Sequence, residues 1–172
     1  MLLEKLLIPD YMFARYDDIT PAFLASIGVR ALLIDIDNTL APYEQPDPDE
    51  RNFAWVARMR QAGVALTFVS NNHRERVERF AAPLGVPAFW DAGKPLRKTL
   101  DIAMQQMGSS VHDTAMLGDQ LLTDAYAGKH IGLRTLIVPP IRDKRTLFVR
   151  AKRYIERPYI RKYRKLHPEK EV

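Results

Sequence analysis

The sequence predicts an α/β fold, in which a central parallel β-sheet has helices packed on both faces. Short apolar runs alternate along the chain with amphipathic stretches of helical periodicity, a pattern typical of strands joined by right-handed crossover helices. Each apolar run ends at polar or turn residues, as expected where parallel strands deliver functional side chains to one edge of a sheet. The length of 172 residues, with 47% hydrophobic and 27% charged side chains, suits a globular domain with an extension.

The apolar runs are predicted to be strands buried on both faces, because they are short and bounded by polar residues. They occupy residues 31–36, 64–69, 114–117 and 133–138, with a weaker strand at 87–90. Helices are predicted between them at residues 48–61, 74–82, 95–107 and 122–129. Pro48 and Pro95 suit a first helical turn, where the missing N–H has no partner to lose. Gly63 and Gly108 suit helix ends.

Composition excludes several classes of protein. The chain contains no Cys, so it has no disulfide framework, no thiolate metal site and no cysteine nucleophile. No run approaches the roughly 18 apolar residues that a membrane-spanning helix needs. Residues 1–9 are too short and too quickly charged for a secretory signal. We therefore expect a cytoplasmic protein, with peripheral association at the inner membrane surface as a further expectation.

The charge of the chain is unevenly distributed. Residues 142–172 hold 12 Lys or Arg and 4 Asp or Glu, a net charge of +8. Residues 1–141 hold 14 basic and 17 acidic side chains, a net charge of −3. We predict a domain over residues 1–141, which begins with a short helical segment, and a basic, partly helical extension over residues 142–172. Anionic membrane, nucleic acid and the domain itself are the three alternative partners of this tail.

The tail contains a predicted amphipathic helix. Its apolar positions follow helical spacing and form one stripe, made by Leu147, Phe148, Ala151, Tyr154 and Ile155. Basic residues cover much of the opposite arc, and Pro158 is predicted to end the helix. Such a helix can lie in a membrane interface through its apolar stripe, or dock the stripe on the domain.

A cluster of acidic residues follows the predicted strands. Asp35 and Asp37 close the first strand, and their two carboxylates would repel each other unless a cation joined them. Hard oxygen ligands of this kind suit Mg²⁺. Asp119 and Asp124 follow a later strand and could supply further ligands. Lys94 could neutralise both a carboxylate and a phosphoryl oxygen.

Four segments carry a resemblance to a known family. They read DIDNTL at residues 35–40, VSNN at 69–72, GKP at 93–95 and GDQLLTD at 118–124. These segments resemble the four motifs of the haloacid dehalogenase (HAD) superfamily phosphatases. The similarity extends over most of the chain to the YqeG-like branch of class IIIA, whose members are similar to the fungal mitochondrial phosphatidylglycerophosphate phosphatase. The resemblance implies a Rossmann-like three-layer core.

The resemblance also implies a role for each acidic residue. Asp35 would be the nucleophile that forms an aspartyl-phosphate. Asp37 would protonate the leaving alkoxide and then activate water. The Asp37 backbone carbonyl, the Asp35 carboxylate and Asp119 would hold Mg²⁺. Asp124 would be either a further metal ligand or a residue that orients the ligands.

Substrate contacts are implied for four more residues. Ser70 and the Asn71 amide would hold the phosphoryl oxygens, and Lys94 would stabilise their charge. Thr39 would steady the loop that carries the two aspartates and would contact the substrate.

The loops at the site are too short for an inserted cap domain. Residues 40–48 form a short connection, and residues 72–93 leave room for one helix and a strand. An uncapped site can admit a head group attached to a lipid or a macromolecule; alternatively, another subunit or the tail covers it. We therefore predict a Mg²⁺-dependent phosphate-monoester hydrolase acting on phosphatidylglycerophosphate or a similar anionic phosphate. The alternative is an RNA- or ribosome-associated binding module that keeps the fold.

Overall fold

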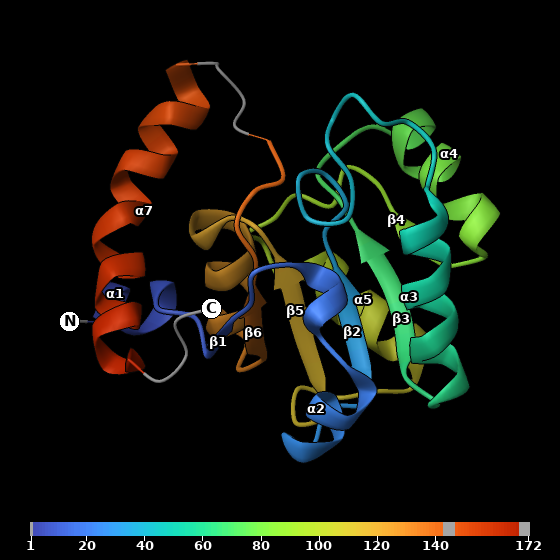
Figure 1. The fold of residues 1–172 in the computed structure, drawn as a ribbon, viewed down its shortest axis with the longest axis horizontal. Coiled ribbons are helices and arrows are strands. Elements are labelled where there is room, and N and C mark those ends of the chain that lie inside the picture. The colour runs from blue at the N-terminus through green and yellow to red at the C-terminus, as the bar shows by residue number, and fades with distance from the viewer. Residues whose placement is uncertain (1, 143–146, 169–172) are drawn as a thin grey trace.

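A parallel sheet forms the centre of the molecule (Figure 1). The structure is a computed structural model that describes residues 2–142 and 147–168. Within these residues six strands form one sheet, in the order β1-β6-β5-β2-β3-β4, and every neighbouring pair is parallel. The strands are β1 (Tyr11–Met12), β2 (Ala31–Ile34), β3 (Ala65–Val69), β4 (Ala88–Phe89), β5 (Thr114–Gly118) and β6 (Arg134–Ile137).

Helices cover both faces and one edge of the sheet (Figure 1). One face carries the short α2 (Pro21–Ser26) with α3 (Glu50–Gln61) and α4 (Arg74–Leu84), and the other carries α5 (Lys98–Met107) and α6 (Tyr126–His130). The β1 edge is lined by α1 (Leu2–Leu7) and α7 (Leu147–Leu166), and a π-helical turn, η2 (Leu121–Ala125), precedes α6. The predicted three-layer α/β fold is confirmed.

Side chains of β2 alternate between the two cores, which explains why the strand is apolar throughout. Leu32 and Ile34 belong to the core under α3 and α4, whereas Leu33 belongs to the core under α5. All three side chains are fully buried. Each contributes about 1.5–3 kcal/mol of transfer free energy on burial.

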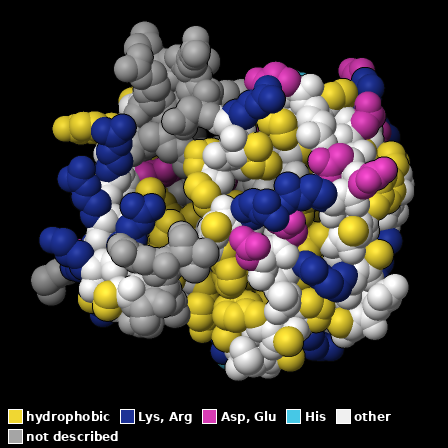
Figure 2. All heavy atoms as spheres, in the orientation of Figure 1, with side chains coloured by type: hydrophobic (Ala, Val, Ile, Leu, Met, Phe, Trp, Pro, Cys, Tyr) yellow, Lys and Arg dark blue, Asp and Glu magenta, His cyan; other side chains and the backbone are white. Residues whose placement is uncertain are grey.

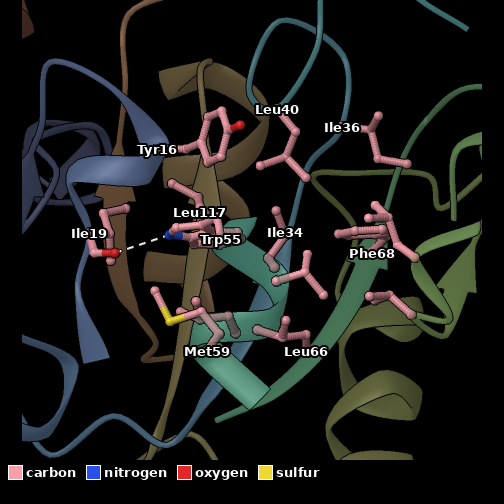
Figure 3. Packing of buried hydrophobic residues seen from close by; sticks show 14 of the residues in the cluster. Tyr16, Ile19, Ile34, Ile36, Leu40, Trp55, Met59, Leu66, Phe68 and Leu117 are labelled. Carbon is pink, nitrogen blue, oxygen red and sulfur yellow. Dashed lines mark hydrogen bonds between the residues drawn. The ribbon is translucent and has the colours of Figure 1, made fainter. Parts of the chain in front are cut away.

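Trp55 of α3 joins its helix to the N-terminal part of the chain (Figure 3). The indole Nε1 donates a hydrogen bond of 3.0 Å to the carbonyl of Ile19. The ring also packs edge-on against Tyr16, with centroids 5.3 Å apart. This contact holds the turn η1 (Tyr16–Asp18) against the main core.

Two predicted helix starts are wrong by a few residues. Helix α3 begins at Glu50, because the carboxylate of Asp49 caps it by accepting from the Asn52 amide at 3.0 Å. Pro48 therefore precedes the helix. Helix α5 begins at Lys98 rather than Pro95. The strand β1 and the helix α2 were not among the predicted elements.

The predicted helix 122–129 is also divided in the structure. Residues Leu121–Ala125 form the π-helical turn η2, and the α-helix begins only at Tyr126. This local change places Asp124 in an irregular turn that begins shortly after β5.

Helix α7 continues through Pro158, so the prediction that this residue ends the helix is wrong. Proline removes the hydrogen bond to the carbonyl four residues earlier. Pro158 and Tyr154 are both exposed, so water can satisfy that carbonyl. Packing of residues on both sides of the proline against the domain stabilises the helix through this point.

The docked face of α7 differs from the predicted apolar stripe. Tyr154 and Ile155 are 74% and 52% exposed, whereas Glu156 and Tyr163 are buried. The Leu122 amide donates to the Glu156 carboxylate at 3.1 Å. The Met12 amide donates to the Tyr163 hydroxyl at 3.0 Å. The side chains of Leu147 and Phe148, also part of the predicted stripe, lie outside the described set.

Candidate active site

The site lies where β2, β3 and β5 end, at the carboxyl edge of the sheet. Asp35 directly follows β2, and the chain then turns sharply, since the Leu40 amide donates to the Ile36 carbonyl at 2.9 Å. Asn38 adopts a φ of 64° in this turn, a conformation that asparagine tolerates better than most residues. Its carbonyl accepts from the Ile141 amide at 3.0 Å, which ties the turn to the segment after β6.

Three buried carboxylates meet in this site. Asp35, Asp119 and Asp124 each place one carboxylate oxygen within 4.8 Å of the others. Burial raises the pKa of Asp35 well above its ordinary value; Lys94 opposes this shift, and the charges of Asp124 and Asp119 reinforce it. Burial and the crowding of three carboxyl groups thus disfavour the charged form of Asp35, and Lys94 offsets part of this cost.

Lys94 is the counter-charge within the cluster. Its Nζ donates to Asp35 Oδ1 and to Asp124 Oδ1, both at 2.7 Å, and its side chain is 2% exposed. Burial opposes the charged form, but Asp124 and Asp35 together hold the pKa of Lys94 above its ordinary value. The lysine therefore stays charged in this buried position.

Asn71 fixes the backbone of Lys94. Its side-chain Nδ2 donates to the Lys94 carbonyl at 2.9 Å, and its Oδ1 accepts from the Lys94 amide at 2.8 Å. This paired contact holds residue 94 in a loop and explains why the next helix begins later than Pro95. Asn71 was predicted to act through its own backbone amide; the structure gives its side chain this additional contact.

Asp124 is held in place from two sides. The Gln120 amide donates to Asp124 Oδ2 at 3.1 Å. A Cβ atom added at Gly118 would lie 2.3 Å from Asp124 Cγ, far inside van der Waals contact. Glycine at the end of β5 therefore leaves the space that this carboxylate occupies.

Asp37 lies outside the three-carboxylate cluster. Its Oδ2 accepts a hydrogen bond of 2.9 Å from Asn72 Nδ2, and its Oδ1 lies 3.1 Å from Arg76 Nη2. The two aspartates of the first motif thus have separate surroundings, one with Lys94 and the other with Arg76.

The remaining predicted residues lie in the same region. The Thr39 hydroxyl donates to Asp35 Oδ2 at 3.3 Å. Ser70 is 1% exposed, and its Oγ accepts from the Asn72 amide at 3.1 Å. Tyr43 was not predicted to lie here; burial raises its pKa, and the charges of Asp37 and Asp35 add to the shift. Nothing in the sequence indicates that Tyr43, a single tyrosine in a loop, lies near these two aspartates.

The donor set fits a divalent cation. Asp35, Asp119 and Asp124 carry three negative charges if all are ionised, whereas Lys94 supplies one positive charge. A divalent ion would balance the remainder, and carboxylate oxygens are the ligands that hard cations prefer. Among the described residues these three form the group of acidic side chains close enough to share an ion.

Comparison with known proteins identifies the family. A family model described as HAD-hydrolase-like matches residues 91–140. The chain is 35% identical over 156 residues to a probable phosphatase, YqeG, of Bacillus subtilis (strain 168), and the match covers 91% of each protein. The chain belongs to the haloacid dehalogenase superfamily. This membership confirms the predicted class of enzyme, a phosphatase.

Solved structures of HAD phosphatases share the fold. One is a putative 3-deoxy-D-manno-octulosonate 8-phosphate phosphatase of Vibrio cholerae, with a TM-score of 0.55, 15% identity, and coverage of 76% of this chain and 75% of the other. Another is the cobalt-bound form of the deoxy-D-mannose-octulosonate 8-phosphate phosphatase of Haemophilus influenzae, with a TM-score of 0.51, 13% identity, and coverage of 79% of this chain and 90% of the other. At these identities the likeness concerns the fold alone.

Proposed function

We propose that the chain is a Mg²⁺-dependent phosphate-monoester hydrolase that works through an aspartyl-phosphate at Asp35. The observation that carries this proposal is the buried cluster in which Lys94 bridges Asp35 and Asp124, beside Asp119. Asp35, Asp119 and the Asp37 carbonyl would hold the ion, with Asp124 as a further ligand or an orienting residue. When bound, Mg²⁺ would neutralise charge on the transferring phosphoryl group.

The residues of the chain would perform two successive displacements. Asp35 attacks phosphorus, the bond to the leaving oxygen breaks, and Asp37 donates a proton to that oxygen. Water then attacks the aspartyl-phosphate, Asp37 takes its proton, and phosphate leaves as Asp35 is restored. Lys94, Ser70 and the Asn71 amide would stabilise the phosphoryl oxygens, and Thr39 would steady the Asp35 carboxylate through their contact.

The proposed substrate is phosphatidylglycerophosphate or a similar anionic lipid phosphate. Within residues 2–142 the connections after β2 and β3 contain no inserted domain, so a phosphate attached to a large body can approach the site. We further propose that α7 contacts an anionic membrane. Figure 2 shows Lys and Arg side chains along the edge of the molecule that α7 forms. In the described part of the chain, no helix is long and apolar enough to cross a bilayer.

Activity against a panel of phosphates tests the proposal. Phosphate release from an aryl phosphate, an alkyl phosphate and phosphatidylglycerophosphate in mixed micelles should require Mg²⁺ and stop when EDTA is added. The lipid phosphate should give the highest kcat/KM. Turnover that persists in EDTA would overturn the metal requirement, and a preference for the water-soluble esters would overturn the lipid substrate.

Substitutions on the exposed face of α7 separate the membrane role from catalysis. Arg157, Arg161 and Lys165 are exposed, so replacing all three by Gln leaves the docked face intact. Each basic residue near an anionic surface contributes about 1 kcal/mol, so vesicle binding should fall about 100-fold. Hydrolysis of the aryl phosphate should not change. Unaltered binding to phosphatidylglycerol vesicles would contradict the membrane role, and tighter binding to RNA than to vesicles would favour the nucleic-acid alternative.

A further inference from the structure

Arg76 is a largely buried cation to which the proposed reaction assigns no role. Its side chain is 12% exposed, and its guanidinium lies over the ring of Phe80, 5.2 Å from the centroid. Its Nη1 donates to the Pro46 carbonyl at 3.0 Å. The residue thus joins α4 to the loop between β2 and α3. Burying an arginine is costly without a partner that compensates its charge.

That partner is Asp37. Arg76 Nη2 lies 3.1 Å from Asp37 Oδ1, and both side chains are nearly nine-tenths buried. The contact lacks the geometry of a hydrogen bond, since neither atom has a hydrogen-bond partner. Asn72 supplies the directional bond, to the other oxygen of the same carboxylate, at 2.9 Å. Arg76 therefore attracts Asp37 by charge, and the hydrogen bond from Asn72 sets the orientation of the carboxyl group.

Lys94, the other buried cation of the site, already has carboxylate partners of its own. Lys94 is shared by Asp35 and Asp124, and Asp119 lies in the same cluster. An Asp37 side chain drawn into that cluster would add a fourth negative charge. Arg76, which belongs to α4, opposes this movement because its positive charge attracts Asp37 away from the cluster.

We propose that Arg76 is a positioning residue that, together with Asn72, holds the Asp37 carboxyl group within reach of the leaving oxygen, where its protonated form donates in the first displacement and its carboxylate accepts a proton from water in the second. The inference rests on the proposed role of Asp37 as general acid. Proton transfer is effective only within hydrogen-bond reach of the leaving atom, so a displaced Asp37 loses its contribution. Arg76 itself touches neither the Asp35 carboxylate nor the acidic cluster in the described contacts.

Leaving-group dependence distinguishes this role from a merely structural one. An aryl phosphate releases a stable phenolate and needs little protonation, whereas an alkyl phosphate releases an alkoxide that needs a proton. The ratio of kcat/KM for the alkyl ester to that for the aryl ester therefore reports on the first displacement, in which Asp37 donates. Asp37→Asn should lower this ratio about 100-fold, within the usual range for general acid catalysis.

Two variants remove the charge of Arg76 in different ways. Arg76→Gln keeps a donor for the Pro46 carbonyl, and Arg76→Met keeps apolar packing against Phe80; either one that is folded at the assay temperature decides the question. We expect the alkyl-to-aryl ratio to fall about tenfold, an intermediate loss relative to Asp37→Asn. In the Asp37→Asn background, the same substitution should lower the ratio by less than about twofold.

Arg79→Met is the matched control. Arg79 ties α4 to the same loop through Asp47 at 2.7 Å but makes no described contact with Asp37. The alkyl-to-aryl ratio of kcat/KM for Arg79→Met should equal that of the unaltered protein. Equal losses on both esters after substitution of Arg76 would overturn the positioning role. If Asp37→Asn itself leaves the ratio unchanged, the proposed general acid is wrong, whatever Arg76 does.

Discussion

Asp35→Asn is expected to abolish phosphate release while leaving the fold intact. The substitution keeps the size of the side chain but removes the charge that attacks phosphorus, so turnover of an aryl phosphate should fall more than about 10⁴-fold. Burial raises the pKa of Asp35, so a neutral side chain at this position meets no new desolvation cost. Lys94 keeps Asp124 as its partner at 2.7 Å.

Thermal unfolding without Mg²⁺ checks that the loss is chemical. The Tm of Asp35→Asn should lie within about 3 °C of the unaltered protein or above it. Asp101→Asn is the control, because Asp101 is an exposed carboxylate paired with Arg97 on the surface of α5. Its activity should remain unchanged. Appreciable turnover by folded Asp35→Asn protein would contradict the covalent mechanism.

Lys94→Met is expected to give the largest loss of stability among the site variants. Removing the lysine leaves Asp35 and Asp124 buried without the ammonium that bridges them. Breaking a buried ion pair in this way costs about 3–5 kcal/mol of unfolding free energy. Added Mg²⁺ should recover part of this loss, since an ion that binds only the folded state stabilises it.

Denaturant unfolding in EDTA and in Mg²⁺ measures both effects. Lys129→Met serves as the control, because Lys129 pairs with Asp10 at a half-buried position away from the acidic cluster. We expect it to lose about 1 kcal/mol in either buffer. If Lys94→Met unfolds at the same denaturant concentration as the unaltered protein in EDTA, the lysine does not compensate the cluster. If Mg²⁺ stabilises neither protein, the carboxylates do not bind this ion.

The placement of the acidic residues could be predicted because it follows from strand order. Parallel strands deliver their carboxyl ends to one edge, so residues after β2, β3 and β5 had to meet there. Asp35, Ser70 and Asp119 are such residues. The resemblance of their motifs to the HAD family then supplied expected roles, which the proposed substitutions test.

The surroundings of each side chain could not be predicted in the same way. Arg76 lies four positions after Asn72 along the chain, and nothing in that spacing indicates that both reach Asp37. Asn71 binds the backbone of Lys94 across 23 positions of sequence. Such contacts depend on how α4 and the loops pack against the sheet. Local sequence patterns carry no information about packing between residues that are far apart in the chain.

The sequence by itself determined the α/β class, the positions of the central strands and the edge at which the polar residues gather, because burial on both faces demands continuous apolar runs. Tertiary structure alone decided that α5 begins only at Lys98, that α7 continues through Pro158, and which face of α7 is covered. Helical periodicity put Tyr154 and Ile155 on one apolar stripe, for which docking on the domain and contact with a membrane were both open. In the structure these two residues are exposed, and Glu156 and Tyr163 are buried. Their hydrogen bonds to the backbone of Leu122 and Met12 satisfy polar groups that a purely apolar face would leave unpaired.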